Sequence, residues 1–126
     1  MFLKPMLDTP DAPWTLRNAR NGLVLARKLE PAFDSKARRR GLLGRQGLDV
    51  GAALIIAPCN SIHTFFMKFA IDVVFVSRDG RVAKVYQALP AWRIGVCWNS
   101  IAVIELAAGA AARAKTRVAD DLQIVR

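Results

Sequence analysis

The chain has 126 residues, of which 53% are hydrophobic, and it carries a formal net charge of +9. This length lies within the usual range of one domain and is sufficient to bury a core. No run of eighteen apolar residues is present, which excludes a membrane-spanning helix, and the first residues lack the apolar stretch of a secretory signal. We therefore expect a cytoplasmic protein without a membrane partner.

Positive charge is concentrated in the N-terminal third of the chain. Residues 1–45 contain ten Lys and Arg against four Asp and Glu, whereas residues 46–126 contain nine against six. Such an excess favours anionic partners, among them nucleic acid. A candidate basic patch consists of Arg27, Arg38, Arg39, Arg40 and Arg45. Basic charge also increases solubility, so a nucleic-acid-binding module is an alternative rather than the leading hypothesis.

Turn and cap signals place the first elements. Residues 1–13 contain three prolines and predict an extended or disordered arm, followed by a single globular domain over residues 14–126. Residues 14–17 and 23–29 flank Asn21-Gly22, a pair that favours a hairpin. Asp34 or Ser35 can cap a short helix that extends to about Leu43.

Apolar runs separated by turn residues define the rest of the chain. The turn Asp79-Gly80 predicts a hairpin of residues 71–76 and 81–88, and residues 107–115 predict a short Ala-rich helix. Further strands are predicted at residues 52–57, 101–106 and 122–125. The fold class is therefore mainly β, or α+β by element count. We expect a small antiparallel β-sheet, closed or partly closed into a barrel, with two short helices.

Two carboxyl groups lie in apolar strands. Asp72 has apolar neighbours on both faces of its strand, and Glu105 shares a strand face with Ile101 and Val103. A buried carboxylate needs a charged or hydrogen-bonding partner, which directs attention to the basic residues nearby. The loop at residues 90–93 adds side chains that suit binding. The candidate pocket consists of His63, Met67, Lys68, Asp72, Trp92, Arg93 and Glu105.

The same residues permit a catalytic and a structural interpretation. In the first, Asp72 or Glu105 works with His63 as an acid–base pair. In the second, Lys68 or Arg93 pairs with Asp72, while Glu105 accepts backbone N–H bonds at the start of the following helix. The apolar residues of this segment are expected in the core rather than in a ligand-stacking surface: Phe65, Phe66, Met67 and Phe69.

Cofactor and metal signatures are missing. Cys59 and Cys97 are far apart and have no metal-ligand spacing, so we expect reduced structural thiols without a disulfide. No nucleotide-binding, zinc-protease or hydrolase motif occurs, so we expect no cofactor and no metal.

Several short motifs together resemble one prokaryotic family over roughly residues 25–125. They are Gly41-Leu42-Leu43, residues 63–68 with Asp72, Asp79-Gly80, residues 90–93 and residues 103–109. The sequence resembles the family called domain of unknown function 192, and departs from it at Phe66, Ala70 and Ala119, where Trp, Pro and Gly are common. The resemblance implies a compact, mainly antiparallel β domain and no established activity. The leading hypothesis is a non-catalytic accessory module that binds an unidentified small molecule or protein.

Overall fold

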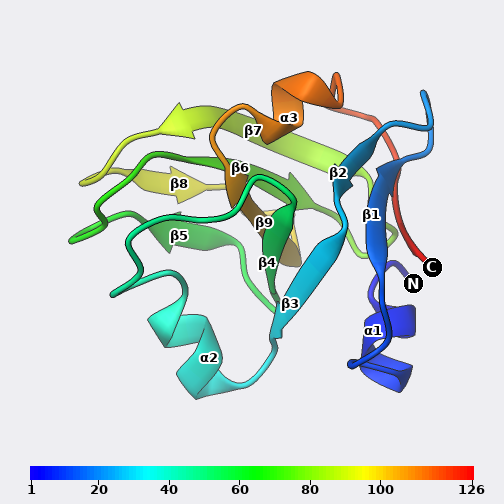
Figure 1. Cartoon of the computed structure of the whole chain (residues 1–126), viewed down its shortest axis with the longest axis horizontal. Helices are drawn as coiled ribbons and strands as arrows, with labels where there is room; N and C mark the ends of the chain where they lie inside the picture. The colour runs from blue at the N-terminus through cyan, green and yellow to red at the C-terminus, as the bar shows by residue number, and fades with distance from the viewer.

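The computed structural model describes residues 1–126 and contains ten strands and three short helices (Figure 1). A three-stranded antiparallel sheet has the order β10-β1-β2, and a five-stranded mixed sheet has the order β3-β4-β9-β6-β7. The smaller sheet comprises β1 (Thr15–Asn18), β2 (Val24–Ala26) and β10 (Leu122–Val125). The larger comprises β3 (Lys28–Ala32), β4 (Ala52–Ile56), β6 (Ile71–Val76), β7 (Val82–Leu89) and β9 (Ala102–Ala107). A separate two-stranded ribbon pairs β5 (Ser61–His63) with β8 (Ile94–Val96).

The five-stranded sheet is the middle layer of the molecule. Alternate residues of its inner strands enter two different hydrophobic cores, because successive side chains of a strand point to opposite faces. In β6, Val74 and Val76 face the first core, whereas Val73 and Phe75 face the second. This arrangement explains why every residue of β6 is buried.

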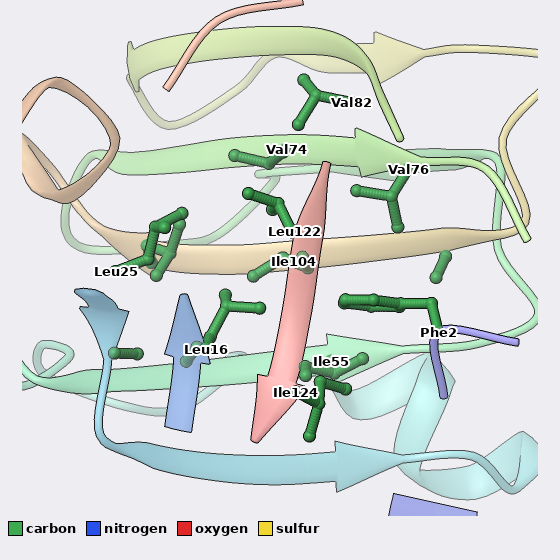
Figure 2. Close-up of a cluster of buried hydrophobic side chains, with 14 of the residues drawn as sticks. Phe2, Leu16, Leu25, Ile55, Val74, Val76, Val82, Ile104, Leu122 and Ile124 are labelled. Carbon is green, nitrogen blue, oxygen red and sulfur yellow. The ribbon is translucent and has the colours of Figure 1, made fainter. Parts of the chain in front are cut away.

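The first core lies between the two larger sheets. Figure 2 shows β10 crossing the strands of the five-stranded sheet at a steep angle, with Leu122 and Ile124 packed towards Ile55 and Ile104. Two of the helices, α1 (Lys4–Asp8) and α3 (Ala110–Arg113), also contribute to this core.

The N-terminal residues belong to this core, which corrects the prediction of an extended or disordered arm at residues 1–13. Phe2, Leu3 and Met6 are buried, and Phe2 is drawn beside the β10 cluster in Figure 2. Pro5 lies in the first turn of α1, a position that proline tolerates. Residues 1–13 were predicted to be extended because of their prolines, but burial of their apolar side chains fixes this segment against the core.

The second core lies on the other face of the sheet and forms the base of the candidate site. It is covered by α2 (Ser35–Arg40), by the segment after it and by the β5–β8 ribbon. Asp34 caps α2 as predicted, because its carboxylate accepts the N–H of Ala37. The helix ends at Gly41, whose φ of 49° and ψ of −127° suit only glycine.

The mainly β fold class is confirmed, with differences in detail. None of the sheets closes into a barrel, there are three helices rather than two, and β3 runs parallel to β4. The predicted hairpin of residues 71–76 and 81–88 is present as β6 and β7. Both helices predicted from the sequence are shorter than expected, and none of the three is long and apolar enough to cross a membrane.

A buried polar network closes the C-terminal turn. Asp120 accepts hydrogen bonds from Asn18 at 2.8 Å, from Arg20 Nε at 2.6 Å and from the Arg117 backbone N–H at 3.0 Å. These donors, above all Arg20, hold the pKa of Asp120 well below its ordinary value. Ala119, just before it, has a φ of 78°, the left-handed conformation that glycine adopts more easily.

Candidate functional site

A cavity of about 260 Å³ lies between α2 and its following segment on one side and the residues around β5 on the other. Figure 1 shows α2 beside β5 at the edge of the molecule. The floor belongs to the five-stranded sheet, through Ile56 and Glu105. The walls are formed by Arg38, Arg39, Arg40, Gly41, Leu42, Leu43, Pro58, Cys59, Ser61, Ile62, His63 and Met67.

Glu105 is the only acid that lines this cavity. It lies on the central strand β9, opposite Leu54 of β4 and Val73 of β6, and is only 3% exposed. No hydrogen bond of the chain reaches its carboxyl group, whose oxygens open onto the cavity. Burial raises the pKa of Glu105 from its ordinary 4.5 to about 7, against the smaller opposing influence of the Arg45 charge.

Gly41 allows the backbone to pass close to this carboxyl group. A Cβ atom at Gly41 would lie 3.8 Å from Glu105 Oε1, so any larger side chain would occupy the space above the acid. The preceding residues bring three arginines to the wall of the cavity: Arg38, Arg39 and Arg40. Arg38 is fixed by a 2.9 Å hydrogen bond to the Phe33 carbonyl. Three arginines and one acid therefore line the cavity.

The opposite wall carries a thiol, an imidazole and a thioether. Cys59 donates to the Ser61 carbonyl at 3.0 Å, and burial raises the pKa of its thiol. His63 Nδ1 accepts the N–H of Phe65 at 3.2 Å, and Met67 is buried. The chain bends around Pro58, so Cys59 and His63 both line this cavity.

Asp72 does not belong to this cavity. Because Val73 is paired with Glu105, the neighbouring Asp72 points to the opposite face of the sheet. Its carboxylate accepts backbone N–H groups of Ala88 at 2.8 Å, Gly109 at 3.0 Å and Ala111 at 2.9 Å. The structural interpretation of these acids was therefore wrong in its assignment. Asp72, not Glu105, accepts the backbone N–H groups at the start of α3. Neither Lys68 nor Arg93 forms an ion pair with Asp72.

The other predicted pocket residues lie beside the cavity rather than in it. Lys68, Trp92 and Arg93 are exposed on the loops next to His63. Buried Thr64 joins these loops, since its hydroxyl donates to the Pro90 carbonyl at 2.6 Å and accepts the Arg93 N–H at 2.9 Å. Sequence reasoning missed Thr64, Gly41 and Cys59 as parts of this region, and only the proline just before Cys59, which permits a bend, could have indicated Cys59.

The five arginines of the predicted basic patch fall into two places, because Arg45 shares a hollow with Arg40 and only Arg27 lies apart. Arg38, Arg39 and Arg40 line the cavity with Glu105. Arg45 bonds both carboxylate oxygens of Glu30 at 2.9 Å. Arg27 lies elsewhere, in a hollow beside α3 together with Arg113.

The arrangement suits ligand binding and proton exchange. A carboxyl group with a pKa of about 7 can either donate or accept a hydrogen bond near neutral pH. Guanidinium groups bind carboxylates and phosphates. No group of three or more His, Cys, Asp and Glu side chains is placed to hold a metal ion.

The fold is shared with two solved structures. A protein of unknown function from Novosphingobium aromaticivorans has 23% identity and a TM-score of 0.75, over 89% of this chain and 84% of that one. A protein from Sinorhizobium meliloti, described as a candidate transcription regulator, has 19% identity and a TM-score of 0.76, over 88% of this chain and 91% of that one. These likenesses establish the fold alone.

None of the curated proteins matches the sequence. A family model described as "Uncharacterized ACR" matches residues 16–124. This match covers most of the chain, including most of β1 and β10 and all the residues that line the cavity. The chain therefore belongs to the domain of unknown function 192 family.

Proposed function

We propose that this protein is a non-catalytic binding module whose cavity takes a small ligand with a hydrogen-bond donor at one end and an anionic group at the other. The observation that carries the proposal is Glu105, whose carboxyl group opens onto the cavity floor and has no hydrogen-bond partner within the chain. A ligand donor would supply the missing partner. An ammonium group is the strongest such donor, because it also compensates the charge of the ionised acid.

The walls define the other end of the ligand. Three arginines line the cavity, and an arginine binds a carboxylate or phosphate with good geometry. The volume of about 260 Å³ lies just below the range of about 300–1,000 Å³ usual for small-molecule sites. The proposed ligand is therefore small and zwitterionic, as an α-amino acid is.

Calorimetric titration can test both ends of the ligand separately. The probes are L-amino acids, their methyl esters, which lack the carboxylate, and the matching α-hydroxy acids, which lack the ammonium group. Glu105→Gln should weaken amino-acid binding about tenfold or more, as expected for a lost charge-assisted hydrogen bond, and should affect α-hydroxy acids less. Arg40→Gln should weaken amino acids but not their esters.

The matched control is Asp121→Asn, which removes an exposed acid that does not line this cavity. Its affinities should equal those of the wild-type protein. Equal binding by the Glu105→Gln variant, or no binding of any probe to the wild-type protein, would contradict the proposal.

A second candidate function is a small enzyme in which Glu105 and His63 exchange protons with a substrate. It is supported by the pKa of about 7 at Glu105, which suits a general acid or base, and by the presence of both side chains in one cavity. Asp72 does not take part, since three backbone groups occupy its carboxylate. Chemical conversion of a bound ligand, lost in His63→Gln, would favour the enzyme.

Nucleic-acid binding has less support, because Arg27 lies apart and Arg45 is paired with Glu30. We expect oligonucleotide binding to be weak, to fade with salt and to show no sequence preference. We also propose a cytoplasmic location, in which Cys59 and Cys97 remain free thiols.

A further inference from the structure

Two neighbouring loops present aromatic side chains to solvent at one end of the molecule. One follows β5 and the other precedes β8, and both project at the left of Figure 1, away from the chain termini. Phe66 is 72% exposed and Trp92 is 56% exposed. Beside them lies Ile94, the exposed partner of His63 in the ribbon. We refer to Phe66, Trp92 and Ile94 as the aromatic tip.

Phe66 and Trp92 both have an unfavourable backbone conformation. Phe66 has a φ of 65° and Trp92 a φ of 67°, a left-handed conformation that costs a residue with a Cβ atom about 1–2 kcal/mol. The hydrogen bonds of Thr64 to Pro90 and Arg93 fix both loops in this position. Large aromatic groups held in water at such a cost indicate a role outside the fold.

The surroundings of the tip are basic. Residues 50–71 and 80–104 together contain none of the ten acids of the chain, yet they contain Lys68, Arg93 and His63 next to the tip. Lys68 and Arg93 are exposed. A partner of this surface is therefore apolar at its centre and negatively charged around it.

The ring geometry favours a membrane surface over a single nucleic-acid strand. The Phe66 and Trp92 rings lie 4.6 Å apart and are tilted by 60°, and Phe65 packs on Trp92 at 5.7 Å. The rings therefore contact one another at an angle instead of forming the parallel, open platform on which bases stack. A projecting pair of aromatic groups with basic neighbours suits the headgroup region of a bilayer, where Trp and Lys or Arg are enriched.

We propose that the aromatic tip docks this protein reversibly on an anionic membrane surface, with Phe66 and Trp92 in the headgroup region and Lys68 and Arg93 against anionic lipid. This inference is independent of the cavity that contains Glu105. The proposed contact is at the membrane surface and requires no membrane-spanning helix, of which none is found.

Co-sedimentation with lipid vesicles tests the proposal. The full chain should bind phosphatidylcholine vesicles that contain phosphatidylglycerol, and should bind pure phosphatidylcholine vesicles much more weakly. The double variant Phe66→Gly/Trp92→Gly should lose binding while remaining folded, because glycine adopts both positive φ values without strain. Trp98→Ser is the matched control, since Trp98 is 78% exposed but follows β8 at its other end.

A second pair of variants tests the charges. Lys68→Gln and Arg93→Gln should each weaken binding to anionic vesicles about fivefold, the usual contribution of a basic residue at such a surface. Lys36→Gln, an exposed lysine on α2, should have no effect. The proposal fails if the wild-type protein binds neither vesicle, if it binds both equally, or if the glycine double variant still binds. Tip-dependent binding of a single-stranded oligonucleotide without vesicle binding would overturn it in favour of nucleic acid.

Discussion

Replacing Glu105 with glutamine should change how the stability of this protein depends on pH. The folded state raises the pKa of Glu105 from 4.5 to about 7, so the folded protein retains a proton that the unfolded chain has already lost. Stability therefore falls as pH rises from 4.5 to about 7, and the loss is complete above that range. Between these two values the loss corresponds to about 3 kcal/mol.

Glutamine has the shape of the protonated acid but cannot ionise. The Glu105→Gln variant should thus match the wild-type protein near pH 4.5 and exceed its free energy of unfolding by up to about 3 kcal/mol above pH 7. This difference is a large fraction of the 5–15 kcal/mol typical of a domain, so urea unfolding across this pH range can measure it.

The control is Asp121→Asn, since Asp121 has an exposed side chain paired with Arg81. Its free energy of unfolding should differ from that of the wild-type protein by about 0–1 kcal/mol and by the same amount throughout. If the wild-type and Glu105→Gln curves run parallel from pH 4.5 to pH 7, Glu105 is not a buried, unpartnered acid.

Three further outcomes follow from the structure. Asp72→Ala should lower the free energy of unfolding by about 3 kcal/mol, because three backbone donors lose a charged acceptor and the Ala111 N–H is fully buried; an unchanged urea midpoint would contradict this role. Ala119→Gly should raise stability by about 0.5–1 kcal/mol through relief of the positive φ, and a lower melting temperature would show that no strain is present. Thiol titration of the denatured, non-reduced protein should count two free thiols, and fewer than two would contradict this prediction. In the native protein Cys59 should react slowly because burial raises the pKa of its thiol, and fast reaction would contradict that cause.

Local patterns in the sequence were enough to predict most strands. The hairpin at β6 and β7 followed from two apolar runs around Asp79-Gly80, and the start of α2 followed from Asp34. The hairpin around Asn21-Gly22 also forms, but the connection between β1 and β2 is longer than a two-residue turn. The Asn21 side chain donates a hydrogen bond to the Ala114 carbonyl. These features depend on residues close in sequence, so a short window contains their cause.

Burial of the N-terminal segment could not be predicted from residues close in sequence. Phe2 and Met6 gain their partners from β10, more than a hundred residues away in the sequence. The exposure of Phe66, which was expected in the core, was equally hidden, since aromatic residues are buried more often than not and the left-handed backbone depends on the bonds of Thr64.

The sequence by itself determined that two acids lie in apolar strands and that a buried acid there needs a partner. Only the tertiary structure decided their roles, because pairing of Val73 with Glu105 sends Asp72 to one face of the sheet and Glu105 to the other. On one face the start of α3 supplies backbone donors to Asp72, and on the other a cavity leaves Glu105 without any. Strand register is set by contacts distant in sequence, and a shift of one residue would exchange the faces.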